Sequence, residues 1–319
     1  MGETYRRGLH GLGDGLFAWL QPDGGWGWSN AGLITDGGES ILIDTLFDMT
    51  LTREMLAAMR DAVPAAANIG TVVNTHANGD HCWGNALVEG AQIVASQASA
   101  EEMAEVPPAM LASMLASADQ MGLLGDYLKT IFGRFDFAGI EERAPTRTFC
   151  ERCTLTVGNR RIECIEVGPA HTKGDTIVHV PDARTVFTGD ILFANGHPVM
   201  WAGPVGNWIK ACDQIIGLDV ETVVPGHGPI ATKAHVARLR DYLGYIRDQA
   251  KARYDAGLGA FEAARSIALD QWSDWGDAER IAVNVATLYR EFSGDTNPPN
   301  VLELFSWMAQ LHRDRAGSR

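Results

Sequence analysis

The stretch Thr71-Val72-Val73-Asn74-Thr75-His76-Ala77-Asn78-Gly79-Asp80-His81 contains the most informative pattern in the chain. It begins with β-branched apolar residues, which favour a buried strand, and it ends in residues that include three strong metal ligands. We therefore expect His76, Asp80 and His81 on the loop after the strand, where a rigid sheet holds a site in place. On a regular strand Asp80 and His81 would point to opposite faces. Gly79 permits the turn that lets both residues converge with His76.

Three later segments also place a ligand-type residue in a glycine-rich loop after a strand-like run. They are residues 167–175 (VGPAHTKGD), 186–190 (VFTGD) and 223–228 (VVPGHG), which contain His171, Asp190 and His227. Imidazole and carboxylate groups suit zinc, iron or manganese, and several strand ends are needed to surround an ion. Four such strand ends predict a pocket for two metal ions.

Together the four segments resemble the metallo-β-lactamase superfamily, whose signature is H-x-H-x-D-H followed by a distant His, an Asp and a final His. The resemblance covers about residues 15–230. It implies one metal site formed by His76, Asn78 and His171, a second formed by Asp80, His81 and His227, and Asp190 as the bridge between them. The family's second histidine is Asn78 here, and an amide oxygen is a weaker ligand than imidazole for a borderline-soft ion. We therefore predict weaker metal binding, or a harder ion, at the first site.

The resemblance also implies the fold, a four-layer αβ/βα sandwich of two mixed sheets with helices outside and the metals at one edge. Independently, the alternation of strand-like and helix-like segments indicates an α/β layered domain. We expect a metallo-β-lactamase-like domain at residues 1–231 and a helical C-terminal extension at 232–319 packed on it. A helical insertion at about 97–140 is rich in Met and Leu, which suits a lid over an apolar substrate. A plain packing helix or a dimer contact would explain the same composition.

Residue patterns predict the individual elements. Strands are expected at 14–20, 26–35, 40–44, 69–74, 92–95, 153–157, 162–167, 176–180, 185–188 and 221–224. Helices are expected at 48–63, 82–88, 96–105, 109–132, 207–216, 232–255, 259–270, 276–291 and 300–313.

Composition limits the class of partner. The 319 residues have a formal net charge of −14, which argues against nucleic acid and anionic membranes. No apolar run is long enough to span a bilayer, and the first ten residues lack the apolar region of a signal peptide. The odd number of five cysteines, without an export signal, indicates reduced thiols and a cytoplasmic protein. The expected partner is a small-molecule substrate, and the helical segments are candidates for a homo-oligomer surface.

The ligand pattern predicts a hydrolase in which a metal-bound hydroxide cleaves a small ester, thioester, lactone or amide. The expected cofactor is one or two Zn²⁺ ions, with iron or manganese as alternatives. Asp80 is expected to be essential for catalysis. His197, in the loop that follows Asp190, is a candidate for proton transfer or substrate binding, or else a core residue. Asp44 and Asp175 are candidates for orienting the imidazoles, or for forming turns. An iron-dependent oxidoreductase and a non-catalytic metal-binding module remain alternative functions.

Overall fold

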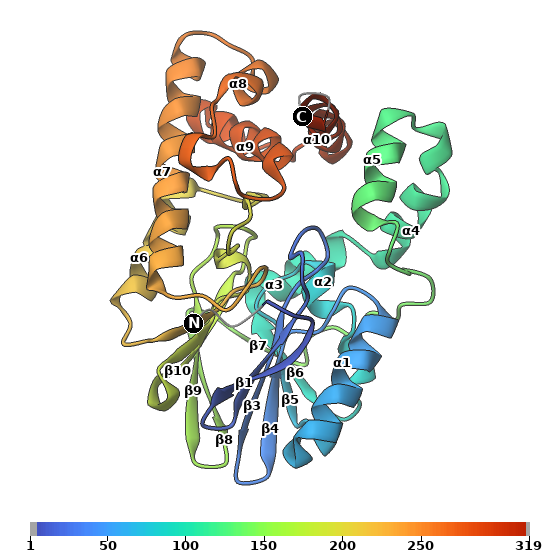
Figure 1. Cartoon of the computed structure of the whole chain (residues 1–319), viewed down its shortest axis with the longest axis vertical. Helices are drawn as coiled ribbons and strands as arrows, with labels where there is room; N and C mark the ends of the chain where they lie inside the picture. The colour runs from blue at the N-terminus through green and yellow to red at the C-terminus, as the bar shows by residue number, and fades with distance from the viewer. Residues whose placement is uncertain (1–4, 317–319) are drawn as a thin grey trace.

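The computed structural model describes residues 5–316 and arranges their strands in two mixed sheets (Figure 1). The first sheet has the order β1 (Gly8–Gly13), β2 (Leu16–Leu20), β3 (Ala31–Asp36), β4 (Glu39–Ile43), β5 (Thr71–Val73), β6 (Gln92–Ser96) and β7 (Arg147–Phe149). The second has the order β12 (Thr222–Val224), β11 (Thr185–Phe187), β10 (Thr176–Val180), β9 (Arg160–Glu166) and β8 (Arg152–Val157). Strands β4 to β7 pair in parallel, and so do β11 and β12, while the other neighbours are antiparallel.

Alternating side chains along the central strands explain why the sheets pack face to face. Ile41 and Ile43 of β4 lie in a core between the sheets, together with Val178 of β10. Leu42 lies in a second core with Met55 of helix α1 (Met49–Ala62). Because successive residues of a strand point to opposite faces, a single strand contributes to both cores.

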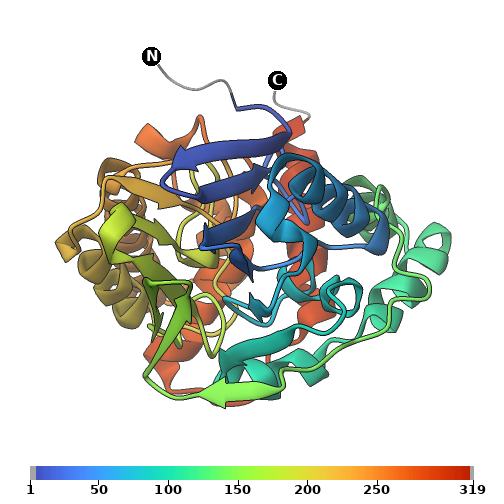
Figure 2. The same cartoon turned by 90° about the horizontal axis from the view of Figure 1, so that it is seen from below.

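Helices cover the outer face of each sheet. Helix α1 begins at Asp48, whose carboxylate accepts a hydrogen bond of 2.8 Å from the backbone N–H of Leu51, and ends before Pro64. On the other side, helices α6 (Val205–Gly217) and α7 (Lys233–Asp255) pack on each other and on the second sheet. The resulting helix–sheet–sheet–helix order is visible in Figure 2 and confirms the predicted four-layer fold.

The insertion consists of α3 (Gln97–Glu102), α4 (Pro108–Ala116) and α5 (Leu123–Phe132). The prediction of one continuous helix over 109–132 is wrong, because the chain leaves the helix at Ser117 and re-enters one after Gly122. Gly122 has a φ of +56°, a conformation that glycine adopts without the steric cost of a side chain.

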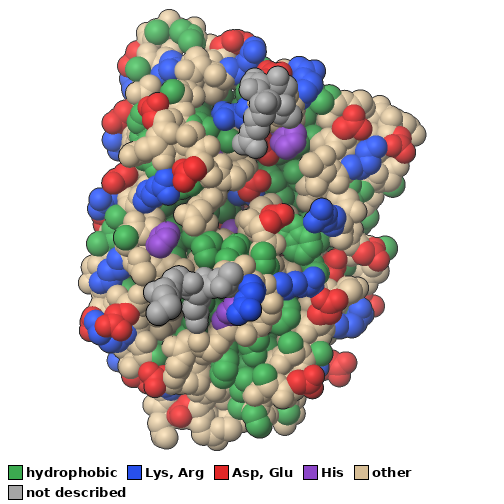
Figure 3. Space-filling model, viewed as in Figure 1, with side chains coloured by type: hydrophobic (Ala, Val, Ile, Leu, Met, Phe, Trp, Pro, Cys, Tyr) green, Lys and Arg blue, Asp and Glu red, His purple; other side chains and the backbone are tan. Residues whose placement is uncertain are grey.

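The C-terminal extension adds α8 (Ala260–Ser266), α9 (Ile281–Ser293) and α10 (Val301–Ala316) to α7. Helix α10 contacts both α9 and α5, so the insertion and the extension meet beside each other above the sheets (Figure 1). Across residues 5–316, none of the helices has the length and apolar character needed to cross a membrane. On the face shown in Figure 3, acidic and basic side chains are interspersed among hydrophobic ones.

Three other predictions about elements need correction. Residues 26–30 form a loop, and the predicted strand begins only at Ala31, because the Asn30 amide bonds to the carbonyls of Pro225 and Gly228. The helix predicted at 82–88 is instead the single turn α2 (Gly79–Cys82) followed by a 3-10 turn at Asn85–Leu87. Strands β1 and β7 were not predicted, since β1 is glycine-rich and β7 is short and largely exposed.

Candidate metal centre

Six of the predicted ligand residues meet at one edge of the two sheets. They fall into two groups in which one ligand atom from each residue lies within 4.8 Å of those of the others: His76, His171 and Asp190 in the first, and Asp80, His81 and His227 in the second. Each group combines residues from loops that follow different strands, so the fold itself brings them together. Five of the six are at most 4% exposed, and Asp80 is the most accessible, with 13% of its side chain exposed.

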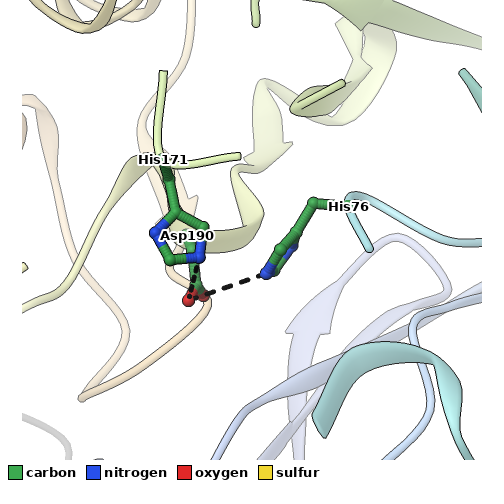
Figure 4. Close-up of side chains that lie close together, drawn as sticks. All are labelled: His76, His171 and Asp190. Carbon is green, nitrogen blue, oxygen red and sulfur yellow. Dashed lines mark ion pairs between the residues drawn. The ribbon is translucent and has the colours of Figure 1, made fainter. Parts of the chain in front are cut away.

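The first group is arranged around the Asp190 carboxylate (Figure 4). Its Oδ2 lies 3.3 Å from Nε2 of His171 and 3.7 Å from Nε2 of His76. Both imidazoles therefore turn the same ring nitrogen toward one carboxylate oxygen.

The second group is arranged around Asp80, whose Oδ2 lies 3.3 Å from Nε2 of His227 and 3.8 Å from Nε2 of His81. Asp190 reaches this group as well. Its Oδ1 lies 3.2 Å from Nε2 of His81, and its Oδ2 lies 3.5 Å from Nε2 of His227. The Asp190 carboxylate thus lies between the two groups, which is the position that a bridging ligand requires.

Several of the facing atoms have no hydrogen-bond partner in the described part of the chain. They are the Nε2 atoms of His76 and His81 and the Oδ1 atom of Asp190, all buried. Buried polar atoms are normally paired, so unpaired nitrogen and oxygen atoms that face one another fit the coordination of a divalent cation. The residues present at this site therefore fit a metal ion.

Charges within the site favour the same conclusion. Burial would raise the pKa of Asp190, but the surrounding imidazoles, led by His227 and His81, hold it well below its usual value. Burial lowers the pKa of His76 and of His171, so both rings are neutral and have a lone pair to offer. For His81 the Asp190 and Asp80 carboxylates outweigh burial and raise the pKa. A bound cation would replace the proton that these carboxylates otherwise attract.

Neighbouring groups orient the imidazoles. The Asp44 carboxylate lies 2.9 Å from Nδ1 of His81 and accepts hydrogen bonds of 2.7 Å from both the backbone N–H and the hydroxyl of Thr75. This contact matches the first alternative considered for Asp44, since ligating imidazoles usually donate their other N–H to a carboxylate or carbonyl. Asp175 instead accepts hydrogen bonds from Thr172, and so shapes the loop beside His171.

Asn78 lies against the first group. Nδ1 of the neutral His171 ring is 2.6 Å from the carbonyl oxygen of Val199, so this nitrogen donates and Nε2 is an acceptor. That Nε2 lies 2.6 Å from Oδ1 of Asn78, which is also an acceptor. A shared cation removes this repulsion, and so does an amide turned to present its NH₂ group. Asn78 therefore lies beside the first group, and its contribution to metal binding stays a prediction.

His197 lies away from this site. It is fully buried among rings of the extension, with Tyr242 and Trp275 at 5.1 and 5.5 Å, and its Nε2 faces the carbonyl of Trp272 at 3.1 Å. Burial lowers its pKa to about 3, and it does not line the cavity described below. The expectation of a role in proton transfer is therefore corrected to the alternative of a core residue, which joins the 195–204 loop to the extension.

At Gly226, within the motif that contains His227, only glycine fits for a steric reason. A Cβ atom at Gly226 would clash with Oδ1 of Asp190 and with the backbone of Gly189. Glycine therefore lets the loop before His227 approach the carboxylate that both groups share.

The site opens into a cavity of about 1010 Å³. Asn78, Asp80, His171, Asp190 and His227 line one part of it, and aromatic rings line much of the rest, namely Trp26, Phe47, Trp83, Phe132, Phe193, Trp201 and Phe305. Trp26 and Trp201 belong to this lining, whereas Trp28 does not and packs on Phe135 at 4.8 Å.

Sequence reasoning missed Arg280, which also lines the cavity. It is 1% exposed, pairs with Asp277 at 3.1 Å, donates to the carbonyl of His197 at 2.9 Å and lies 4.4 Å from the Trp26 ring. The available signal was the position of this arginine directly before the apolar run 281–283, which indicates that its side chain is buried. A buried charge needs partners, and this one therefore called for a search for them.

The sequence model of the metallo-beta-lactamase superfamily matches residues 24–227, which include every ligand residue named above. The chain belongs to the metallo-beta-lactamase superfamily. Among curated superfamily relatives, the acyl-coenzyme A thioesterase MBLAC2 of Bos taurus is 24% identical over 231 residues, covering 68% of this chain and 79% of the relative. A hydroxyacylglutathione hydrolase of Brucella anthropi is 33% identical over 96 residues, covering 30% of this chain and 36% of that enzyme.

Solved structures show the same fold. The inverting sec-alkylsulfatase Pisa1 from Pseudomonas sp. superimposes with a TM-score of 0.64 at 16% identity, covering 92% of this chain and 52% of that one. This chain thus spans about half the length of the alkylsulfatase. A metallo-beta-lactamase from Pontibacter korlensis superimposes with a TM-score of 0.57 at 17% identity, covering 75% of this chain and 99% of that one. The larger coverage by the alkylsulfatase has to include most of the C-terminal extension.

Proposed function

We propose that this protein is a metal-dependent hydrolase that cleaves an acyl bond, a thioester or a related ester, in a small-molecule substrate. The observation that carries the proposal is the pair of ligand groups, which share Asp190 and open into a single cavity lined in part by aromatic rings. Of two curated relatives, one is named an acyl-coenzyme A thioesterase and the other a hydroxyacylglutathione hydrolase.

Two metal ions, which we propose to be zinc, would bind through His76, Asn78, His171, Asp80, His81, His227 and the bridging Asp190. When bound, such ions supply an activated water and polarise the carbonyl that it attacks. The neutral rings of His76 and His171 and the ionised Asp190 hold their lone pairs toward this centre. Asp80, the most exposed of the ligand residues, lines the cavity and would orient a water at its edge.

The walls restrict which substrates reach the centre. Phe193 stacks on His227 with ring centroids 5.1 Å apart and an interplanar angle of 5°, so it covers one face of that ligand. Trp201 lies near Trp26 at 6.3 Å and extends the apolar wall. Such a lining favours a substrate with an apolar acyl group and excludes bulk water from the reacting carbonyl.

The test is hydrolysis of acyl thioesters, followed through the released thiol, by the purified protein as isolated, after chelation and after return of zinc. We expect turnover that disappears on chelation and returns with zinc, and Asp80→Ala is expected to lose it. Asp182→Ala, a change at an exposed carboxylate on the 181–183 turn, is the matched control that retains it. Wild-type rates in Asp80→Ala would contradict the proposal.

Elemental analysis of protein purified without added metal separates this proposal from the alternatives. Zinc agrees with it, whereas iron with visible absorbance would favour an oxidoreductase on the same fold. Metal binding without turnover of any acyl substrate would instead favour a binding module.

A further inference from the structure

The cavity extends well beyond the ligand residues. On one side it is lined by Met110, Leu111 and Met114 of α4, which belongs to the insertion. On another it is lined by Val301, Leu302 and Phe305 of α10, which belongs to the extension. Its volume of about 1010 Å³ lies at the upper end of the range of roughly 300–1,000 Å³ found for small-molecule pockets. A substrate that occupies only the metal centre would leave most of this space empty.

Apolar side chains of both helical segments remain exposed where they line this cavity. Within residues 5–316, five large hydrophobic side chains stand out as exposed, and four of them belong to the lining: Val106 (50%), Met110 (45%), Val301 (45%) and Leu302 (51%). The fifth, Leu258 at 40%, follows α7 and is not part of the lining. Clustered exposure of this kind marks a binding surface, whereas a single exposed leucine needs no explanation.

A series of ring contacts leads from the ligands toward these exposed side chains, with the Arg280 guanidinium packed between two of the rings. Phe193 stacks on the ligand His227, and the Arg280 guanidinium lies 5.3 Å from the Phe193 ring and 4.4 Å from the Trp26 ring. Trp26 in turn contacts Phe305 of α10 at 5.9 Å. A flexible chain with its reactive end at the metal centre can therefore follow apolar contacts to the rim.

Charges in the lining from the insertion side are already paired. The ammonium of Lys173 forms an ion pair with Glu105, and its backbone N–H donates to Glu102 at 2.9 Å. These groups therefore satisfy one another and do not require a polar ligand between α4 and α10.

We infer that the space between α4 and α10 binds the aliphatic chain of the substrate's acyl group, so that the enzyme is selective for long-chain acyl compounds. This inference rests on the proposed function for the position of the reactive bond. The chain lies along the apolar wall, with its carboxyl carbon at the metal centre and its methyl end between the exposed residues of α4 and α10.

The first experiment measures kcat/KM for thioesters of one thiol with acetyl, butanoyl, octanoyl and dodecanoyl groups, all below their micellar concentrations. Burial of each added methylene contributes ~0.8 kcal/mol, so kcat/KM is expected to rise by up to about fourfold per methylene until the chain reaches the rim. A second series with a constant acetyl group and lengthening alkyl thiols is expected to be nearly flat. A flat acyl series, or a rise only in the thiol series, would overturn the inference.

Substitutions at the rim locate the effect. Leu302→Asp and Met110→Asp are expected to lower the ratio of dodecanoyl to acetyl kcat/KM at least about tenfold, since a carboxylate opposes burial of the chain. Leu258→Asp has the same change in charge at an exposed leucine outside the cavity, and is expected to match the wild type. All three positions are exposed, and thermal unfolding verifies that each variant is folded. Equal ratios in all variants would overturn the inference.

A binding experiment separates this inference from the proposed function. Dodecanoate is titrated calorimetrically into Asp190→Ala and into the double variant Asp190→Ala/Leu302→Asp. If dodecanoate binds to Asp190→Ala and binds more weakly to the double variant, the chain site is supported even when no thioester is hydrolysed. If the wild type hydrolyses thioesters without selectivity for chain length, the proposed function holds and the chain site is rejected. Light scattering is the remaining control, because a wild-type dimer that dissociates in Leu302→Asp would assign these residues to a subunit interface and overturn the inference.

Discussion

The metal centre and the helical roof of the cavity, which we define as the insertion 97–140 together with the extension 232–319, are built in opposite ways. The ligands lie on short loops or single helical turns that follow buried strands, and they are nearly all buried. The roof consists of helices that contact one another through side chains far apart in sequence, such as Phe132 of α5 and Phe305 of α10. The first region is therefore fixed by the sheets, whereas the second depends on tertiary packing alone, and substitutions should separate metal binding from roof stability.

The largest effect is expected at Asp190, because its carboxylate contacts both ligand groups. Asp190→Asn is expected to lower kcat/KM by about a thousandfold or more, equivalent to ~4 kcal/mol, since a neutral amide can neither bridge nor balance two cations. Steady-state kinetics on an acyl thioester checks this, with Asp182→Asn as the control. Retention of even a tenth of wild-type activity would show that Asp190 is not shared.

The next largest effect is expected in the roof. Phe305 is 6% exposed and contacts Trp26, Phe132 and Trp201, so Phe305→Ala is expected to lower the free energy of unfolding by about 3 kcal/mol. The metal content should stay at the wild-type level, because no ligand contacts this ring. Denaturant unfolding and elemental analysis measure the two quantities. Leu302→Ala on the same helix is the control, and its free energy of unfolding is expected within about 0.5 kcal/mol of the wild-type value. Loss of metal in Phe305→Ala would contradict the independence of the metal centre and the roof.

A smaller effect is expected at Asn78, where this chain departs from the family signature. Asn78→His is expected to tighten metal binding at the first group by about tenfold, because imidazole is the better ligand for a borderline-soft ion. Competition with a chromogenic chelator measures the affinity of each site. Unchanged or weaker binding would indicate that Asn78 does not coordinate and only contacts the His171 ring.

The smallest effect is expected at the contact between the extension and the insertion. Nδ1 of His312 lies 3.6 Å from the buried Glu279 carboxylate, which also accepts a hydrogen bond from Tyr127 of α5. Glu279 raises the pKa of His312, so the contribution of this pair to stability is present below the unfolded-state pKa of about 6.5 and is lost as pH rises through the folded-state pKa. Because 45% of the His312 side chain is exposed, His312→Gln is expected to cost less than about 1 kcal/mol at about pH 6 and nearly nothing at about pH 9. Equal costs at both pH values would contradict this assignment.

The same contrast explains how much could be predicted from sequence. The stretch 71–81 carries its ligands and its strand in consecutive residues, and the later ligand motifs repeat that arrangement, so His76 and His81 could be identified locally. The orientation of Asp44 toward His81 needed the structure, because the two residues are on different loops. His197 was misassigned as a catalytic candidate, because closeness to Asp190 in sequence does not determine which side of a loop faces the cavity.

Most helices of the roof were predicted, but the cavity that the insertion and the extension line together was not. Residue patterns identified α7 and α10, and the Met- and Leu-rich composition of 97–140 suggested a lid. It could not show that Met110 and Leu302 line one cavity, since their distance depends on how two separate segments pack on the sheets. Arg280 was not predicted to line the cavity for the same reason, because its partners Trp26 and Asp277 come from different parts of the chain.

Metal stoichiometry tests the central claim most directly, namely that loops from four strand ends form one metal centre. We would measure zinc per chain by mass spectrometry in the wild type, in His76→Ala and in His81→Ala, after dialysis against metal-free buffer. The account predicts about two ions in the wild type, with each variant losing the ion of its own group. A wild-type protein without bound metal, or variants that keep the full amount, would contradict it.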